Sequence, residues 1–600
     1  MSDLAGLDAT TLDGTYPRPQ LVRRSWHDLS GEWDFARDDD LAARVDDVRF
    51  DRTIVVPFPP ESPASGIHET GFLPCVWYRR RFGRDELVDA GYGDAAPRVL
   101  LHFGAVDHTA TVWVNGELVA THEGGQSPFV ADVTDAVDDR GDNVVVVRAV
   151  DLPSDVSVLR GKQDWREEPH SIWYHRTTGI WQPVWLECVP GTSIDGVAIR
   201  SDIPSATIDV DVRLTGATSH TDLWVRVEIS HDGETIAEGR VRTLGSTAAT
   251  ARLVIARQLN GQQYEELLWT PDRPTLLAAS IALETAGGVE IDRVASYVGL
   301  RSVAVSRDAF LLNDRPTAVR AVLAQNYWPQ THLAATAEML RREVELILEL
   351  GFNTARVHQK AEDPRFLYWA DRLGLMVWAE TASAYSFDVR AMRGLVDEWT
   401  AIVARDQSHP SIVVWVPLNE SWGVQHISHD PRQQAFSRSV ADLTRALDGS
   451  RPVISNDGWE HAASDILSIH DYESDPAVLT ERYGDEDRLR RMVEGFGPAG
   501  RRLSLGEGAG ELPVMVTEFG GVSLRTGNAK DWGYSTASDP ATFEHSVTAI
   551  VRAIATAAPL AGFCYTQLTD TGQETNGLLT ADRQPKIPVE SLRAAILGRE

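Results

Sequence analysis

The second half of the chain is a regular alternation of strand-like and helical segments, and this pattern constrains its fold most. Eight short apolar runs occur between about residue 303 and residue 600, separated by amphipathic stretches of helical length. Eight strands that alternate with helices over about 300 residues predict a (β/α)8 barrel. The expected strands cover residues 318–323, 353–357, 375–379, 412–417, 452–455, 466–470, 513–517 and 561–566. The expected helices cover residues 334–350, 364–373, 392–406, 433–447 and 541–557.

The first half of the chain predicts β structure. Runs rich in Val, Leu, Trp and Thr alternate with turn residues, and Asn115-Gly116 between two such runs indicates a hairpin. We expect a jelly-roll sandwich over residues 1–190, an immunoglobulin-like sandwich over residues 191–302 and the catalytic barrel over residues 303–600. The clearest runs are 98–103, 110–114, 143–150, 184–189, 209–214 and 223–229.

Charge and composition narrow the range of partners. The net charge is −30, which repels nucleic acid and anionic lipid, so we expect neither a nucleic-acid nor a membrane partner. Three scattered cysteines argue against a disulfide scaffold. The first residues lack a basic region followed by an apolar run, so we expect a cytoplasmic protein. A homo-oligomer is possible on these grounds.

Two predicted barrel strands end in a carboxylate. The fourth ends at Asn419-Glu420 and the seventh at Thr517-Glu518. Active-site residues of such barrels lie at the carboxyl ends of the strands, and strands four and seven face each other across the mouth. Two carboxylates in one mouth suit glycoside hydrolysis, in which one protonates the leaving oxygen and the other attacks the anomeric carbon or activates water.

The segments around these residues resemble glycoside hydrolase family 2, the family of β-galactosidases, β-glucuronidases and β-mannosidases. Residues 418–422 (Leu-Asn-Glu-Ser-Trp) resemble its acid/base motif and residues 517–521 (Thr-Glu-Phe-Gly-Gly) its nucleophile motif. The likeness extends over nearly the whole chain. Further similar segments are 29–33, 114–116, 123–125 and 178–185 in the sandwich, and 312–316, 353–356 and 409–415 in the barrel.

This resemblance implies roles for particular residues. Glu518 would be the nucleophile and Glu420 the general acid/base of a retaining double displacement, without a cofactor or metal. Asn419 would bind the hydroxyl next to the anomeric carbon, and Arg356 and Tyr472 would position the nucleophile. The remaining candidates for substrate binding are Trp422, Glu380, His358, Tyr565 and Gln567.

The sequence departs from the family pattern in two places. Tyr565 stands near the end of the last strand, where the family commonly has Trp. Uronate-specific members carry Asn-x-Lys before a segment like 577–583, whereas this chain has Gln573-Glu574-Thr575 there. Glu574 would repel a carboxylate, which disfavours a glucuronidase. Asn528-Ala529-Lys530 spells the tripeptide but follows the nucleophile too soon.

The expected function is removal of a terminal non-reducing sugar from a small-molecule or oligosaccharide β-glycoside. A β-galactosidase is the first expectation, and a β-galactofuranosidase or arabinosidase of the same family is the alternative. A transglycosylase using the same two carboxylates is a further possibility. From a different class, a catalytically inactive carbohydrate-binding protein also remains open.

Overall fold

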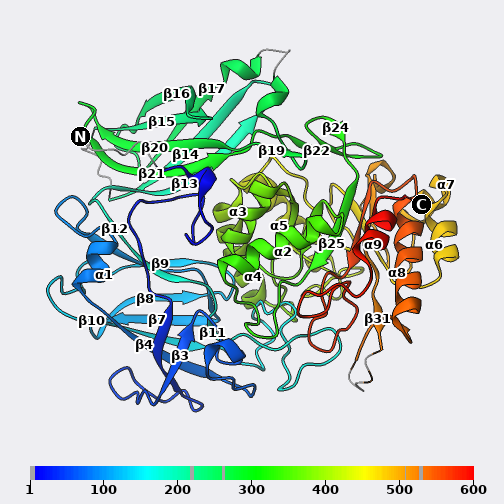
Figure 1. The fold of residues 1–600 in the computed structure, drawn as a ribbon, viewed down its shortest axis with the longest axis horizontal. Coiled ribbons are helices and arrows are strands. Elements are labelled where there is room, and N and C mark those ends of the chain that lie inside the picture. The colour runs from blue at the N-terminus through cyan, green and yellow to red at the C-terminus, as the bar shows by residue number, and fades with distance from the viewer. Residues whose placement is uncertain are drawn as a thin grey trace.

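The computed structural model describes residues 7–216, 222–259, 264–506, 508–525, 527 and 531–599. Two β-sandwiches and a barrel lie side by side (Figure 1). The first sandwich is blue to cyan, the second lies above it, and the barrel with its helices occupies the right of the view. The multidomain architecture is therefore the predicted one, while the boundaries at residues 190 and 302 stay predictions.

The first sandwich consists of a four-stranded and a six-stranded sheet, with an apolar core between them. The four-stranded sheet has the order β1 (His27–Asp28), β12 (Val184–Val189), β5 (Arg98–Phe103), β9 (Phe129–Asp132). The six-stranded sheet has the order β3 (Arg52–Val56), β2 (Gly31–Arg37), β4 (Cys75–Phe82), β10 (Asn143–Val150), β7 (Thr109–Val114), β8 (Glu117–Glu123). Asn115 and Gly116 join β7 to β8 with positive φ at both positions, as the hairpin prediction requires.

The second sandwich consists of a three-stranded and a four-stranded antiparallel sheet. The first sheet has the order β13 (Ser193–Asp202), β14 (Thr207–Thr215), β17 (Ala248–Val254). The second has the order β16 (Glu234–Arg242), β15 (Leu223–His231), β20 (Leu277–Thr285), β21 (Glu290–Val298). Alternating Val, Ile and Leu side chains of the strands fill the space between the sheets.

Seven parallel strands form the curled sheet of the barrel. Their order is β28 (Ile412–Val416), β27 (Met376–Glu380), β26 (Thr354–Val357), β25 (Val319–Ala324), β33 (Gly562–Thr566), β30 (Val514–Gly520), β29 (Leu467–Asp471). Alternate side chains point inward and outward, so that Ala321 and Leu323 belong to the inner cluster and Val322 and Ala324 to the outer one. All seven match predicted strands to within a few residues.

The strand predicted at 452–455 is wrong as a regular strand. This segment makes isolated parallel bridges, from Val453 to Trp415 and from Asp457 to Asn419. Pro452 has no N–H to contribute to a ladder, which is one reason why pairing stays local. The segment nevertheless lies beside the carboxyl end of β28 and brings Asp457 to the barrel mouth.

Asp-Pro dipeptides begin several barrel helices. The Asp carboxylate accepts a backbone N–H at the start of the helix, and Pro at the first helical position gives up an N–H that would lack a partner anyway. The helices are α2 (Ala337–Glu349), α3 (Pro364–Leu373), α4 (Val389–Asp406), α5 (Pro431–Leu447), α6 (Pro476–Tyr483), α7 (Glu486–Val493), α8 (Pro540–Ala555) and α9 (Val589–Ile596). Those that begin with Asp-Pro are α3, α5, α6 and α8.

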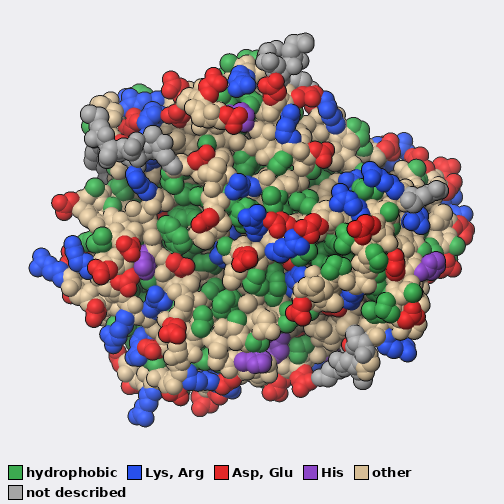
Figure 2. Space-filling view, in the orientation of Figure 1, with side chains coloured by type: hydrophobic (Ala, Val, Ile, Leu, Met, Phe, Trp, Pro, Cys, Tyr) green, Lys and Arg blue, Asp and Glu red, His purple; other side chains and the backbone are tan. Residues whose placement is uncertain are grey.

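The first described residues pass between the three bodies (Figure 1). Val22 pairs with Ala295 of the second sandwich, and the carbonyl of Leu12 accepts a hydrogen bond from the Tyr368 hydroxyl on α3. Acidic and basic side chains are interspersed on the face in Figure 2. Within the described ranges, every helix is too short or too polar to cross a membrane.

Candidate active site

Glu420 lies where the chain leaves β28 at the carboxyl end of the barrel. Glu420 and Ser421 have φ values of 50° and 59°, in the left-handed region that side chains other than glycine rarely adopt. The Glu420 N–H donates to the Asp457 carbonyl at 3.0 Å, and the Ser421 N–H donates to Asn456 at 2.8 Å. These bonds hold a strained turn that fixes the direction of the Glu420 side chain.

Glu518 lies on β30 and is almost fully buried. Its Oε1 accepts a hydrogen bond of 2.9 Å from Nη1 of Arg356, and its Oε2 accepts one from the Tyr472 hydroxyl. Burial raises the pKa of Glu518, but the charges of His470 and Arg356 outweigh burial and hold that pKa below its ordinary value. The carboxylate is therefore kept ionised and aimed by two donors.

The two carboxylates meet at His470. A carboxylate oxygen of Glu420, one of Glu518 and a ring nitrogen of His470 all lie within 4.8 Å of one another. Nδ1 of His470 lies 2.7 Å from Glu420 Oε1, and its Nε2 lies 3.0 Å from Asp457 Oδ2. Burial alone lowers the pKa of His470, but the neighbouring carboxylates of Glu518, Asp457 and Glu420 raise it to about 10. Its two ring nitrogens thus face the carboxylates of Glu420 and Asp457.

Arg356 contacts most of the polar side chains around Glu518. It is fully buried on β26 and contacts three carboxylates: Glu518, Asp457 at 2.8 Å, and Glu380. Its Nη2 donates to Asn419 Oδ1 at 2.7 Å. One guanidinium thus orients groups from four places around the barrel, and the fork geometry of Arg makes this possible.

Asn419 is held with its amide nitrogen free. Because its oxygen accepts from Arg356, the flip of the side chain is fixed, and Nδ2 has no hydrogen-bond partner among the described residues. The residue is 3% exposed. A buried amide N–H₂ without a partner is costly unless a ligand accepts from it. This matches the expected contact with a sugar hydroxyl.

Glu380 and His358 both lie against Arg356. Glu380 binds Arg356 through one oxygen and accepts the Gln359 N–H at 2.9 Å through the other. His358 Nδ1 lies 3.2 Å from Glu380, and burial together with the charge of Arg356 lowers the pKa of His358 well below its ordinary value. Both oxygens of Glu380 have protein donors, so the structure places it as a support for Arg356.

A loop of the first sandwich covers one side of the mouth. Trp422, which follows Glu420, stacks on Trp173 with ring centroids 5.9 Å apart, and the Trp173 indole N–H donates to the Tyr385 hydroxyl at 2.5 Å. Trp173 belongs to the irregular segment between β10 and β11 (Gly179–Ile180). The expected aromatic wall at Trp422 is therefore shared between the barrel and the sandwich.

The structure does not place Tyr565, one of the predicted substrate-binding residues, at the mouth. Tyr565 is fully buried in the cluster between the sheet and the helices, with its ring 5.5 Å from that of Phe519. Side chains alternate along β33, and its neighbour Cys564 takes the inward position. Gln567 does lie at the mouth, but its amide bonds Gln325 at 3.0 Å and Asn576 at 2.7 Å. Residues 528–530 lie outside the described residues.

A cavity of about 540 Å³ opens above Glu420 and His470. Its other walls are Trp459, Tyr472 and Tyr534, and the rings of the two tyrosines are stacked. Lining residues further out are Asp471, Glu473, Ser474, Arg482, Pro498 and Ala499. The cavity therefore combines aromatic faces with the carboxyl group of Glu420, a combination that suits a sugar.

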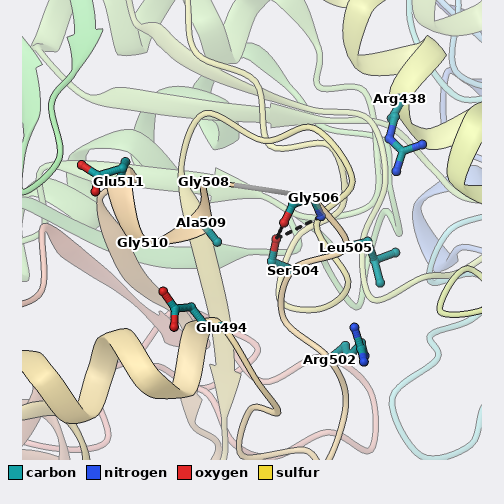
Figure 3. Close-up of a pocket in the computed structure, with 10 residues that line it drawn as sticks. All are labelled: Arg438, Glu494, Arg502, Ser504, Leu505, Gly506, Gly508, Ala509, Gly510 and Glu511. Carbon is teal, nitrogen blue, oxygen red and sulfur yellow. Dashed lines mark hydrogen bonds between the residues drawn. The ribbon is translucent and has the colours of Figure 1, made fainter.

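A larger hollow of about 720 Å³ lies elsewhere, beside α5 and residues 494–511 (Figure 3). Arg438, Arg502, Glu494 and Glu511 stand apart around it, and the drawn hydrogen bonds join only Ser504 and Gly506. The lining residues include none of Glu420, Glu518 or Asn419. Size alone does not make it the site, because the convergent titratable groups lie at the barrel mouth.

Several residues at the mouth were not expected from the sequence. His470 and Asp457 each follow or end an apolar run, and their polar character at a strand end was the available signal. Lys162 also lies there, 3.9 Å from Glu574, a residue that the sequence did single out. Lys162 comes from the first sandwich, so no local pattern in the barrel sequence points to it.

Models of one protein family match both halves of the chain. The model described as "Glycosyl hydrolases family 2, TIM barrel domain" matches residues 303–483. The model described as "Glycosyl hydrolases family 2, sugar binding domain" matches residues 56–190. Together the two models match more than half of the chain.

Curated relatives are similar over part of their length. A β-galactosidase of Thermoanaerobacter pseudethanolicus is 26% identical over 63% of this chain and 48% of its own length. A β-glucuronidase of Canis lupus familiaris is 26% identical over 67% of this chain and 63% of its own length. The chain thus spans about half to two thirds of the length of these relatives.

Solved structures share the fold over nearly the whole chain. A β-glucuronidase of Bifidobacterium dentium superposes with a TM-score of 0.77 at 21% identity, covering 97% of this chain and 98% of that one. A β-galacturonidase of Eisenbergiella tayi gives a TM-score of 0.75 at 18% identity, with the same coverage. At these identities the likeness establishes the fold alone.

Proposed function

The chain belongs to glycoside hydrolase family 2, and on that premise we propose that it is a retaining β-glycosidase that removes a terminal, non-reducing sugar. The observation that carries this proposal is the arrangement of Glu420 and Glu518, with carboxylate oxygens within 4.8 Å of each other. Retaining glycosidases place their carboxyl groups about 5–5.5 Å apart and inverting ones about 6.5–9.5 Å. The close approach of these two oxygens favours the retaining geometry over the inverting one.

In the first step, Glu518 attacks the anomeric carbon. The bond from that carbon to the glycosidic oxygen breaks while a bond to the Glu518 carboxylate forms, and Glu420 gives its proton to the departing oxygen. Arg356 and Tyr472 hold the Glu518 oxygens, which supports an ionised, oriented nucleophile. In the second step, Glu420 takes a proton from water, which attacks the same carbon and releases Glu518.

The shape of the mouth supports an exo-acting enzyme. Trp173 from the first sandwich stacks on Trp422, two residues after Glu420, and so bounds this side of the barrel, while the cavity over Glu420 is lined by Trp459 and Tyr472. A pocket that is closed on one side accepts the end of a glycan rather than its middle. The leaving group would extend along the open side.

A β-galactoside is our first choice of substrate. The support is that several curated relatives are named β-galactosidases, together with the carboxylate of Glu574 beside Lys162, which disfavours the uronates that other relatives' names imply. The test is a panel of nitrophenyl β-glycosides, including furanosides and arabinosides. Clear preference for a furanoside would replace the galactoside.

Glu518→Ala decides the mechanism. Without the carboxylate no covalent intermediate can form, so hydrolysis should fall by several orders of magnitude. Added azide should restore part of the turnover and give a glycosyl azide of inverted configuration. Turnover of Glu518→Ala at the unmodified enzyme's rate would disprove the assignment, and absence of turnover by the unmodified enzyme on the whole panel would disprove the activity.

A further inference from the structure

Two buried groups of opposite charge, Lys162 and Glu574, lie close together on the side of the barrel mouth opposite Glu420. Lys162 is 5% exposed and Glu574 is 3% exposed, and Nζ of the lysine lies 3.9 Å from Oε2 of the glutamate. That distance is too long for a hydrogen bond. Oε2 of Glu574 has no hydrogen-bond partner among the described residues. A buried carboxylate oxygen without a partner indicates a missing donor.

A chain of amides holds Glu574 in place. Gln325 Nε2 donates to Gln567 Oε1 at 3.0 Å, and Gln567 Nε2 donates to Asn576 Oδ1 at 2.7 Å. Asn576 Nδ2 then donates to Glu574 Oε1 at 3.2 Å. Only the last donor of this chain, Asn576, reaches Glu574, and it uses Oε1, which leaves Oε2 on the side of Lys162.

Lys162 reaches the mouth because the loop that carries it is fixed to the barrel. The Gly161 N–H donates to the Ser383 carbonyl at 3.1 Å, and the Tyr385 hydroxyl donates to the Gly161 carbonyl at 2.5 Å. A Cβ at Gly161 would lie 2.3 Å from the Gln359 carbonyl oxygen, so only glycine allows this approach. The backbone contacts of Gly161 therefore fix the position of Lys162.

The pair lies within electrostatic reach of the reacting groups. Burial raises the pKa of Glu574, and the charge of Glu518 raises it further, against the effect of Lys162. Lys162 in turn contributes to the lowered pKa of His358, after burial and Arg356. Glu574 follows β33, whereas Asn419 and Glu420 follow β28, on the opposite side of the barrel mouth.

We infer that Lys162 and Glu574 together bind one hydroxyl group of the sugar, at a position remote from the anomeric carbon, and so select neutral sugars over uronates. This inference rests on the proposed function. A lysine ammonium only donates hydrogen bonds and a carboxylate only accepts them, whereas a hydroxyl does both. A hydroxyl between the two groups accepts from Lys162 and donates to Glu574. The carboxylate of a uronate would satisfy Lys162 but would be repelled by Glu574.

The kinetic test compares neutral and acidic sugars on one leaving group. The substrates are the 4-nitrophenyl β-galactoside, β-glucoside, β-glucuronide and β-galacturonide. We expect kcat/KM of the unmodified enzyme to be at least about 100-fold higher for a neutral sugar, since unpaired buried polar groups give strong rejection. Glu574→Gln should lower the ratio of kcat/KM for the neutral sugar to kcat/KM for the uronide at least about tenfold, because the carboxylate that repels the uronide is lost. Faster turnover of either uronide by the unmodified enzyme would overturn the inference.

Deoxy substrates identify the shared hydroxyl. On the galactoside, Lys162→Met and Glu574→Gln should each lower kcat/KM, and the double variant should lose little more than the worse single one, because both groups bind the same hydroxyl. One of the two deoxy sugars, the 4-deoxy or the 6-deoxy galactoside, lacks the shared hydroxyl. On that sugar the unmodified enzyme should have a low kcat/KM, and neither substitution should lower it further. Equal losses on both deoxy sugars and on the galactoside would show a purely structural role and overturn the inference.

Lys360→Met is the matched control. Lys360 is also buried near the mouth, but it already pairs with Glu362 at 3.3 Å and donates to the Asn326 carbonyl at 3.2 Å. The Lys360→Met substitution should change kcat/KM by the same factor for every sugar. If Lys162→Met does not fold, Glu574→Gln, which keeps the shape of the side chain, carries the test.

Binding of free sugars separates failure of the inference from failure of the proposed function. Calorimetric titration with galactose and with glucuronate, neither of which carries a glycosidic bond, needs no turnover. Tighter binding of the neutral sugar, weakened at least about tenfold by Glu574→Gln, supports the pair even if no glycoside is hydrolysed. Tighter binding of glucuronate, or no effect of either variant, contradicts it.

Discussion

Nδ1 of His470 lies 2.7 Å from Oε1 of Glu420, so a single imidazole ring sets the direction of the proposed acid/base. The ring cannot turn freely, because its other nitrogen is bound to Asp457. The side-chain contacts of His470 are with the carboxylates of Glu420, Asp457 and Glu518. We therefore regard it as a positioning residue that acts through Glu420.

His470→Gln should separate this role from simple structure. The pKa of His470 is raised to about 10, so the stability that its charge contributes is complete below its ordinary value of about 6.5 and is lost as the pH rises through 10. The melting temperature of the unmodified protein should fall as the pH rises from about 6.5 through 10. The His470→Gln variant should not show this part of the fall. We expect kcat to fall about 10²-fold with little change in KM, since Glu420 loses its orientation. His426→Gln, at an exposed position, is the control.

Glu420→Ala should discriminate between leaving groups. Glycosides with acidic phenols need little protonation to depart, so the first step survives and the covalent intermediate accumulates. We expect a burst of phenol, slow turnover afterwards and a lowered KM, whereas unactivated glycosides should be almost inert. Equal slowing of both kinds of substrate, without a burst, would remove Glu420 from the acid/base role.

Asn419→Ala should lower kcat more than it raises KM. The free Nδ2 of Asn419 is the donor expected to bind the hydroxyl next to the anomeric carbon, where hydrogen bonds strengthen in the transition state. Steady-state kinetics on the preferred glycoside measure the split. A 2-deoxy substrate should be affected much less by the substitution, and a change in KM alone would contradict this assignment.

Glu398→Gln should stabilise the protein at alkaline pH. Glu398 on α4 is buried and accepts the Gln126 N–H at 2.7 Å, and burial raises its pKa to about 8. The folded state therefore retains a proton that the unfolded chain releases above its ordinary pKa of 4.5, so stability is lost as the pH rises from 4.5 through 8. The loss is at most roughly 4–5 kcal/mol. Gln keeps the acceptor without the charge, so its melting temperature should be higher than that of the unmodified protein at pH 9 and similar at pH 5. The exposed Glu338→Gln is the control.

Strand periodicity and the position of carboxylates at strand ends made much of the molecule predictable. The runs at 98–103, 143–150 and 184–189 are strands with those bounds, because local burial dictates them. Glu420 and Glu518 meet at the mouth because parallel strands bring their carboxyl ends to one edge of the sheet.

The missed features depend on contacts distant in sequence. Tyr565 was expected at the mouth, but the register of β33 turns it outward and turns Cys564 inward, which a single apolar run does not reveal. Asp457 follows a segment that only bridges β28. Lys162 depends on the docking of a sandwich loop on the barrel, for which the sequence has no periodic signal.

The loop between β10 and β11 has a consequence for how such a site changes. Glu420 and Glu518 belong to the barrel, whereas Lys162 and Trp173 belong to the sandwich segment. A chimera that exchanged only the sandwich would keep the reaction and replace part of the wall against which the sugar lies. One half of the proposed sugar-selecting pair, Lys162, thus lies outside the barrel, whereas the other half, Glu574, stays with the proposed reacting carboxylates.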